Sequence, residues 1–356
     1  MKITVIGGGS TYTPELVSGF LARVASLPLT ELCLMDIDEQ RLSIVGGFAQ
    51  RMVKAQGEPF KVTLTLDQRE AVAGSSYIIT QLRVGMMQAR RGDEYLGHRH
   101  GLIGQETTGV GGMAKALRTI PVIMNLVKDI REVAPNALLA NFTNPAGLVT
   151  EMLTRYAADI PSVGVCNVGI TTKMDILAEY EKLVGEKIAE ERAVLKTLGL
   201  NHLTWHYGFE VDGEEKWGNI FSAYLEELRQ QDQPEWDIRT LETLGMIPNY
   251  YQHYFYYTAK KLKEQAGWPP SRAEEVMAIE KDLLSQYADP ALSKPPDDLM
   301  KRGGAYYSTL ATQLIASHHN DLGQIHIVNL RNNGAVAEYP ADWVLEMPAK
   351  VDKSGI

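Results

Sequence analysis

The chain opens with a short apolar strand that breaks into a glycine-rich turn, and no other segment constrains the fold as strongly. Residues 2–6 read Lys-Ile-Thr-Val-Ile, and Gly7, Gly8, Gly9 and Ser10 follow directly. Glycines let a backbone approach a pyrophosphate closely, and the amides that open the next helix attract its negative charge. The segment therefore predicts a dinucleotide-binding unit with these four turn residues at the cofactor.

The residues that follow the turn support this interpretation. Thr13 and Pro14 are typical of a helix start, with a capping hydroxyl before a proline at the first helical position. The next strand, 32–35, ends at Asp36, which we expect to accept a hydrogen bond from a ribose hydroxyl. A purely structural turn is the alternative, because Tyr12 stands where a third glycine is usual.

Predicted strands and helices alternate through the first half of the chain. Further strands are expected at 61–66, 76–82, 136–141 and 162–166, and helices at 114–133 and 171–187. Strands separated by helices form a parallel sheet that is covered on both faces. The predicted fold class is therefore α/β, with a Rossmann-type parallel sheet.

The pattern changes after about residue 190. Strands are expected at 193–200, 205–211, 325–331 and 335–338, and a helix at 304–318. Hairpin signals replace the strand–helix alternation in this part of the chain. We expect a nucleotide-binding domain over residues 1–168 and a mixed α+β domain, carrying substrate- and metal-binding groups, over residues 169–356.

Composition excludes some partners and favours a compartment. The net charge of −9 over 356 residues argues against nucleic acid or an anionic membrane as the main partner. A small anionic substrate stays possible, since a few local arginines can outweigh a negative average. The two cysteines suit a reducing compartment. With no apolar run that would span a bilayer and no room for a signal peptide, we expect a cytoplasmic protein.

A cysteine and a histidine provide a candidate metal site. Cys166 follows a predicted strand, at the edge where open parallel sheets bind ligands, and His202 lies in Leu-Asn-His-Leu. A thiolate and an imidazole can share a divalent ion whose other positions accept substrate oxygens. An inert buried cysteine and a hydrogen-bonded core histidine are the alternatives.

Other candidates are weaker by themselves. Asn144 also follows a strand and offers a side-chain amide to a ligand, unless it only makes a turn. Gly109, Gly111 and Gly112 predict a loop near the nicotinamide, with a flexible hinge as the alternative. The aromatic run 250–257 lies in a predicted helix and must be mostly core.

Together these segments resemble glycoside hydrolase family four over essentially the whole chain. The matching segments are Ile-Gly-Gly-Gly-Ser (6–10), Asp36-Ile-Asp, Arg90-Arg-Gly-Asp-Glu, Gly-Gln105-Glu-Thr-Thr-Gly-Val-Gly-Gly, Asn141-Phe-Thr-Asn-Pro, Cys166-Asn-Val, Leu-Asn-His202-Leu, Arg302-Gly-Gly-Ala-Tyr and His326-Ile-Val-Asn. The resemblance implies a lactate/malate dehydrogenase-like fold and a glycosidase that uses NAD and a divalent metal, usually manganese. Cysteine and histidine alone would suggest zinc or iron first.

The family is an exception to the two-carboxylate mechanism of glycosidases. Its members are expected to remove a hydride from C3 of the sugar with NAD, which acidifies the C2 proton. A tyrosine takes that proton, the aglycone leaves by elimination, water adds at C1, and the hydride returns.

The resemblance also implies residue roles. Cys166 and His202 match the metal ligands, and Tyr251 best matches the tyrosine base, with Tyr250 and Tyr254 as substitutes. The residue after the cysteine, Asn167, is expected at the catalytic and substrate-binding position. Asparagine there accompanies the 6-phospho-β-glucosidases and aspartate the 6-phospho-α-glucosidases.

Arg90, Asn144 and Arg272 fall where the family contacts substrate. Arginine suits a 6-phosphate because its planar fork binds phosphate oxygens bidentately. A solvated salt bridge is the alternative for each arginine. The expected substrate is thus a phosphorylated disaccharide or an aryl glucoside.

Two departures from the family pattern stand out. Gly169 stands where proline is usual, so the backbone beside the metal site is expected to take a different path. The chain is also expected to lack a C-terminal helical segment. We expect a homodimer or homotetramer.

The leading hypothesis is a 6-phospho-β-glucosidase. The alternatives are a 6-phospho-α-glucosidase or a non-phosphorylated glycosidase of the same family, a 2-hydroxy-acid dehydrogenase, and a catalytically inactive nucleotide sensor.

Overall fold

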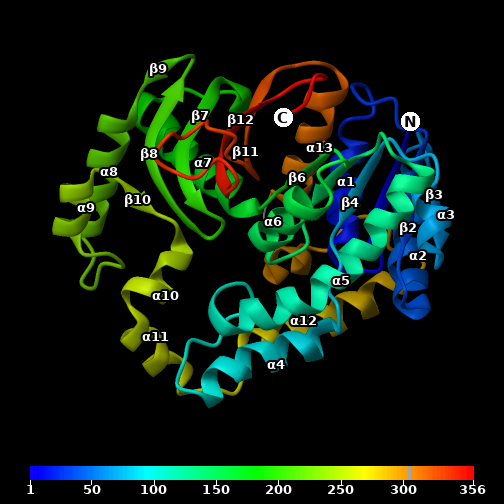
Figure 1. The fold of residues 1–356 in the computed structure, drawn as a ribbon, viewed down its shortest axis with the longest axis horizontal. Helices are drawn as coiled ribbons and strands as arrows, with labels where there is room; N and C mark the ends of the chain where they lie inside the picture. Colours follow the sequence, from blue (N-terminus) through cyan, green and yellow to red (C-terminus); the bar gives the residue numbers. More distant parts are fainter. Residues whose placement is uncertain (304–305) are drawn as a thin grey trace.

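The described residues of a computed structural model, 1–303 and 306–356, form a 12-stranded sheet surrounded by helices (Figure 1). The strands are β1 (Lys2–Ile6), β2 (Glu31–Met35), β3 (Lys61–Thr65), β4 (Tyr77–Thr80), β5 (Leu138–Asn141), β6 (Ser162–Gly164), β7 (Ala193–Leu200), β8 (Leu203–Val211), β9 (Glu214–Glu215), β10 (Ile247–Pro248), β11 (Gln324–Arg331) and β12 (Val344–Val351). Their order is β10-β8-β7-β12-β11-β6-β5-β4-β1-β2-β3, and β9 pairs with β8.

The parallel half of the sheet is a Rossmann sheet. Strands β3-β2-β1-β4-β5-β6 pair in parallel, which is the strand order of the dinucleotide-binding fold. Side chains of β1 alternate between two apolar clusters, with Ile3 and Val5 in one and Ile6 in the other. The predicted α/β class and Rossmann-type sheet are confirmed.

The other half of the sheet is antiparallel and continues from β6. Strand β11 pairs with β6 and β12, and β12 then pairs with β7, which forms a long hairpin with β8. In Figure 1 these strands occupy the upper left, beside the parallel half. The predicted mixed second half is thus an antiparallel extension of the same sheet.

Helices cover both faces of the sheet. They are α1 (Thr13–Leu21), α2 (Glu39–Ala55), α3 (Gln68–Val72), α4 (Met86–Arg99), α5 (Gly109–Val133), α6 (Ala146–Tyr156), α7 (Asn167–Val184), α8 (Trp217–Arg229), α9 (Ile238–Leu244), α10 (His253–Tyr256), α11 (Thr258–Gln265), α12 (Arg272–Tyr287) and α13 (Tyr307–His319), with short 3₁₀ turns η1 (Glu190–Arg192), η2 (Tyr250–Gln252) and η3 (Asp297–Arg302). One apolar cluster joins α1, α2 and α13 to the parallel strands, and a second joins α5 and α6 to their opposite face.

Helix α5 is a core helix. Among the described residues it alone is long and apolar enough, by length and composition, to cross a membrane. Its side chains Ile123, Leu126 and Ile130 are fully buried against the sheet, and Lys115 is buried in an ion pair. The amphipathic packing accounts for its apolar composition.

Three predicted elements need correction. No strand forms at 335–338, because the Asn332 side chain donates to the carbonyls of Val336 and Tyr339 and holds this segment as a loop, so the return strand is β12. The aromatic run 250–257 is divided into η2 and α10, with Tyr257 after the end of α10, instead of forming one helix. The predicted helix at 304–318 is α13, and its expected start at 304 lies outside the described residues.

Candidate active site

The glycine turn lies in tight contact with the neighbouring strand ends. The amides of Gly7 and Gly8 both donate to the carbonyl of Met35, and Gly7 has φ +93°. A Cβ atom at Gly7 would lie 2.8 Å from the backbone nitrogen of Leu82, and one at Gly8 would lie 2.8 Å from Leu34 Cβ. The turn therefore requires glycines for packing as well as for any approach to a phosphate.

Asp36 is held against the same turn. Its two carboxylate oxygens accept from the amides of Gly9 (2.8 Å) and Asp38 (3.1 Å). Thr13 does not cap α1 as predicted, and its hydroxyl donates instead to the carbonyl of Gly8. A Cβ atom at Gly9 would lie 2.9 Å from the Asp36 carboxylate, so the cradle that a nucleotide would use is kept open by glycine.

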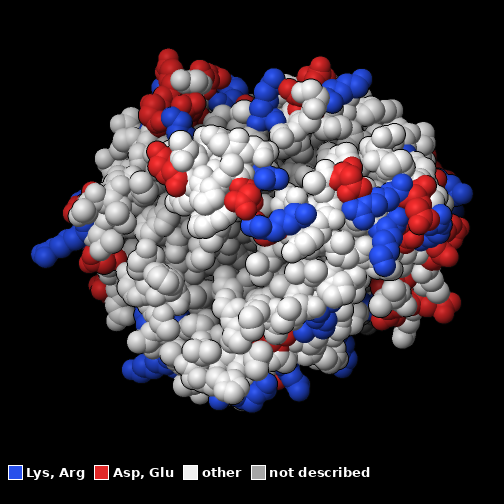
Figure 2. Space-filling model, viewed as in Figure 1, with Lys and Arg blue, Asp and Glu red and all other residues white. Residues whose placement is uncertain are grey.

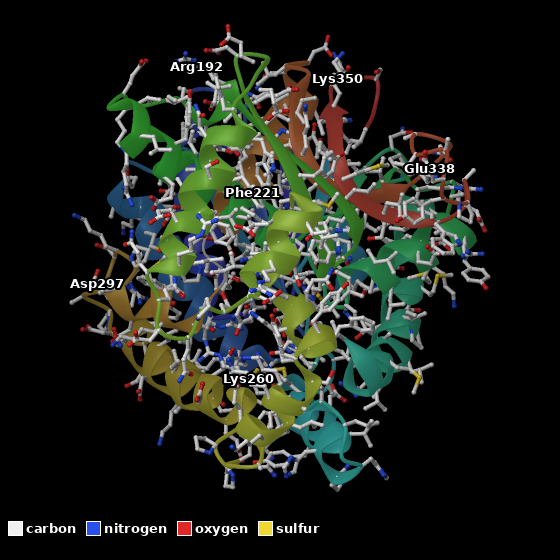
Figure 3. The ribbon with its side chains drawn as sticks, turned by 90° about the vertical axis from the view of Figure 1, so that its left-hand side faces the viewer. Arg192, Phe221, Lys260, Asp297, Glu338 and Lys350 are labelled. Atoms are coloured by element: carbon white, nitrogen blue, oxygen red, sulfur yellow. The ribbon has the colours of Figure 1, made fainter. Side chains whose placement is uncertain are left out.

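A single large cavity extends from this turn to the antiparallel half. Its volume is about 1020 Å³, and Gly7, Gly9, Ser10 and Asp36 line one end, whereas Gly8 does not line it. In Figure 2 the molecule is hollowed near its centre, and the surface there is mostly uncharged while charged side chains gather toward the edges. The cavity has room for a dinucleotide together with a sugar.

Cys166 and His202 come together at the other end. Cys166 lies between β6 and α7, and His202 lies in the two-residue turn between β7 and β8. Their Sγ and Nε2 atoms are 3.3 Å apart although 36 residues separate them in sequence. Among the described residues, no third Cys, His, Asp or Glu completes a metal-binding group. The pair fits a metal whose other positions go to substrate or water.

Hydrogen bonds select the tautomer of His202. The Thr107 hydroxyl donates to Gln105 Oε1 (2.9 Å), so it must accept from the Nδ1–H of His202, 3.0 Å away. The lone pair of Nε2 then faces Cys166. Burial lowers the pKa of His202 to about 4 and raises the pKa of the Cys166 thiol to about 12. The imidazole is therefore ready to bind a metal, and the thiolate needs a cation to form.

Tyr251 lies directly on His202. The two rings are stacked with centroids 3.9 Å apart and planes 4° apart. Asn249 Oδ1 accepts from the Tyr251 amide and holds the start of η2. Burial raises the pKa of Tyr251, and the nearby Arg90 opposes that rise. By contrast, Tyr250 is 56% exposed. Tyr251 is thus the tyrosine of the aromatic run that is stacked on the Cys166–His202 pair.

Two asparagines and two arginines line the same cavity in different ways. Asn144 and Asn167 lie after β5 and β6 and face the cavity with Cys166. The Arg90 side chain, on α4, is 12% exposed and pairs with Glu94 and Glu106. The Arg272 side chain, which begins α12, is 47% exposed and pairs with Glu275. Arg90, Asn144, Cys166, Asn167 and Arg272 all line this cavity, whereas His202 contacts Cys166 without lining it, and of the two arginines Arg272 is the exposed one.

A buried charge cluster beside Arg90 escaped the sequence analysis. Glu106 forms ion pairs with Arg83, Arg90 and Lys115, and these cations keep its pKa well below the usual range. All four side chains line the cavity. The motif Gln105-Glu-Thr-Thr was the available signal. It had been interpreted through its glycines, which lie in the first turn of α5 instead of forming a loop.

A second missed cluster lies beside the glycine turn. Glu280 on α12 pairs with Arg41 and Arg302, and these arginines also donate to the Gly9 carbonyl and the Thr11 hydroxyl. The cluster ties residues far apart in sequence to the turn. Two guanidinium groups around one carboxylate leave a positive excess where a pyrophosphate would lie.

Gly169 does not divert the backbone beside Cys166. Helix α7 begins at Asn167 and continues regularly through Gly169. A Cβ atom at Gly169 would lie 2.7 Å from Ile327 Cγ2 of β11. The close packing of β11 on this helix turn accounts for glycine at this position.

Comparison with known proteins identifies the family. A family model described as "Family 4 glycosyl hydrolase" matches residues 2–182, and one described as its C-terminal domain matches residues 197–356. The chain belongs to glycosyl hydrolase family 4. It is 42% identical to a "Probable 6-phospho-beta-glucosidase" of Bacillus subtilis, and the match covers 100% of this chain and 81% of that relative. It is 37% identical to the 6-phospho-beta-glucosidase of Escherichia coli, and that match covers 100% of this chain and 80% of the relative.

Solved structures agree with this assignment. The 6-phospho-beta-glucosidase of Thermotoga maritima, solved with manganese, NAD⁺ and glucose-6-phosphate, superposes with a TM-score of 0.90 at 38% identity, covering 99% of this chain and 81% of that one. A 6-phospho-alpha-glucosidase from gut microorganisms, solved with NAD and Mn²⁺, gives 0.85 at 26% identity, covering 99% and 82%. A malate dehydrogenase of Cryptosporidium parvum, with 0.56 at 12% identity, shares the fold alone.

Proposed function

We propose that this family 4 glycosidase hydrolyses 6-phospho-β-glucosides with NAD and manganese. The observation that carries the proposal is one cavity with a glycine turn at one end and Cys166 and Tyr251 at the other, where both contact the buried His202. The family's reaction needs both a nucleotide and a metal, and a dehydrogenase of this fold would need only the first. When bound, NAD takes up and returns a hydride and the metal polarises sugar oxygens.

The chain's own residues have separable roles in this proposal. Cys166 and His202 would hold the metal, and the Tyr251 oxygen would accept the C2 proton of the sugar. Asn144 and Asn167 would orient the sugar hydroxyls, with Asn167 next to the reacting carbons. Gly7, Gly9, Ser10 and Asp36 would bind the nucleotide, and Gly8 would keep the turn packed against β2.

Positive side chains that line the cavity support binding of a substrate with a 6-phosphate. Arg83, Arg90 and Lys115 surround Glu106, and Arg272 opens onto the cavity nearby. Phosphate is bound well by guanidinium groups that are already positioned. The β preference is supported by Asn167 and by the relatives, which are 37–42% identical for 6-phospho-β-glucosidases and 28% or less for those that act on α-glucosides.

An aryl glucoside assay tests the proposal. Release of p-nitrophenol should be measured from 6-phospho-β-, 6-phospho-α- and non-phosphorylated β-glucosides, with and without NAD and Mn²⁺. We expect turnover of the 6-phospho-β-glucoside only when both are present. Because the hydride returns to the same sugar, catalytic amounts of NAD should support many turnovers without growth of NADH absorbance. One NADH formed per product, with no aglycone released, would instead establish a dehydrogenase.

We also propose that the chain has a nucleotide domain over 1–168 and a substrate domain over 169–356, and that the enzyme works in the cytoplasm. Both cysteines are free and buried, which suits a reducing compartment.

We propose that the enzyme assembles as a homodimer or homotetramer. On α5, Met113 and Leu117 are 55% and 68% exposed at helical spacing, which supports contact with a second copy. Light scattering of the purified protein measures the assembly, and a monomeric mass would contradict it.

A further inference from the structure

A buried carboxylate lies behind the Cys166–His202 pair. Glu346 is in the middle of β12, where it is only 2% exposed and stands opposite Gly199 of β7 and Asn329 of β11. No Lys, Arg or His pairs with it among the described residues. An ionised carboxylate at such a position is costly unless hydrogen bonds or a cation offset its charge.

The contacts of Glu346 all lead to the β7–β8 turn. Its Oε2 accepts from Asn201 Nδ2 (2.7 Å), and its carboxylate also accepts from the backbone amide of His202. The Asn201 side chain, in turn, forms a hydrogen bond with the Cys166 sulfur. One carboxylate therefore contacts both residues of the turn, and through Asn201 it reaches the sulfur.

The turn needs such support. It has only two residues, Asn201 and His202, between the paired residues Leu200 and Leu203. His202 has φ +66°, in the left-handed region that a residue with a side chain adopts only at a cost of ~1 kcal/mol or more. Gly199, whose Cβ would lie 2.6 Å from the Leu203 carbonyl oxygen, permits the close approach of the two strands. The direction of the His202 ring thus depends on a strained turn.

We infer that Glu346 is a positioning residue for the metal site, which holds the Asn201–His202 turn so that His202 Nε2 faces Cys166. Among the described residues, Glu346 does not form a metal-binding group of three side chains with Cys166 and His202. It therefore acts through the turn and not as a ligand. The inference rests on the proposed metal site.

The role of Glu346 is tested by measuring the affinity of the protein for Mn²⁺ and not its activity. Mn²⁺ binding should be measured by calorimetry or by the electron paramagnetic resonance of free Mn²⁺, on protein saturated with NAD. Glu346→Gln keeps the volume and one acceptor but removes the charge, and Glu346→Leu removes both. We expect the Mn²⁺ affinity to fall ~10-fold for Glu346→Gln and up to ~100-fold for Glu346→Leu, since outer partners of metal ligands typically contribute this much. NAD affinity should be unchanged in both.

Leu345→Ala is the matched control. Leu345 is the fully buried neighbour of Glu346 on β12, and its removal leaves a cavity in the same strand. We expect Leu345→Ala to lower the thermal midpoint while Mn²⁺ affinity stays within about twofold. Should Glu346→Leu fail to fold, Glu346→Gln decides the question.

Four outcomes would overturn the inference or separate it from the proposed function. Wild-type Mn²⁺ affinity in Glu346→Gln contradicts the role of the carboxylate. Equal losses of Mn²⁺ and NAD affinity in either variant, or a loss of Mn²⁺ affinity in Leu345→Ala, show a general structural role instead. If the wild-type protein itself binds no Mn²⁺, the proposed metal site fails, and the inference fails with it.

Discussion

The ring of Tyr251 lies flat on the imidazole of His202, with centroids 3.9 Å apart and planes 4° apart. The histidine is thus fixed on three sides, because Thr107 contacts its Nδ1 edge and Cys166 its Nε2 edge. In the proposed function, Cys166 and His202 would hold the metal, and Tyr251, stacked on His202, would supply the proton acceptor beside them.

Removing the Tyr251 hydroxyl should abolish most activity without disturbing the site. Tyr251→Phe keeps the stacked ring and loses the group that accepts the proton, so we expect kcat to fall ~100-fold or more. Mn²⁺ and NAD affinities, measured by calorimetry, should stay unchanged. Tyr250→Phe is the control, since that ring is half exposed. A fully active Tyr251→Phe variant would transfer the role to another group.

Loss of either metal ligand should remove turnover. We expect Cys166→Ser, His202→Ala and treatment with EDTA each to abolish activity, and Mn²⁺ to restore only the EDTA-treated wild type. Oxidation of the thiol should inactivate the enzyme as well, because the Cys166 thiolate is the proposed metal ligand. Elemental analysis measures the metal bound to each sample. Active protein without bound metal would contradict the proposed metal site.

Substitution of Arg272 and of Arg90 by alanine should affect stability and activity differently. Arg272→Ala breaks an exposed pair with Glu275, so stability should change by less than ~1 kcal/mol while kcat/KM for 6-phosphoglucosides falls ~100-fold. Arg90→Ala leaves Glu94 and Glu106 with a lost partner in a buried site and should destabilise the fold by ~3 kcal/mol. Urea unfolding and steady-state kinetics separate the two effects. A similar loss of stability in both variants would contradict the assignment.

A methyl group in the glycine turn should weaken cofactor binding. Gly9→Ala would bring Cβ to 2.9 Å from Asp36 Oδ2, so the carboxylate must shift, and we expect NAD affinity to fall ~10-fold or more. Gly92→Ala in α4 is the control, because nothing lies within 4 Å of its Cβ position. That variant should gain up to ~1 kcal/mol of stability. Unchanged NAD affinity in Gly9→Ala would argue against a nucleotide at this turn.

Two buried histidines away from the cavity predict an acid-sensitive fold. Burial lowers the pKa of His206 and His326 to about 4, below the value near 6.5 in an unfolded chain. Between these pH values the unfolded chain binds protons that the folded protein does not. The free energy of unfolding should therefore fall as pH drops from about 6.5 to about 4, by up to ~1.4 kcal/mol per pH unit for each histidine.

Urea unfolding at several pH values measures this dependence. His206→Phe should reduce the dependence of the unfolding free energy on pH by about one bound proton, because only His326 of these two histidines then contributes. A slope equal to that of the wild type would show that His206 is protonated in the folded state.

Local patterns account for how much of the fold was predictable. The strand–turn–helix opening and the alternation that follows are short-range signals, and β1, β2 and the parallel sheet formed where they indicated. The error at 335–338 also has a local cause. The strands expected at 325–331 and 335–338 leave only a tight turn between them, whereas the Asn332 side chain donates to three carbonyls of a longer loop.

The sequence by itself determined the α/β class, the glycine turn with Asp36, and the pairing of Cys166 with His202, because each depends on neighbouring residues or on an ordered set of family motifs. Only the tertiary structure decided that Tyr251 lies on His202, that Glu106 pairs with three cations, and that Glu346 contacts the Asn201–His202 turn from behind. These contacts join elements that are distant in the chain. Burial and charge at such contacts come from how helices and strands pack, and no local pattern encodes that packing.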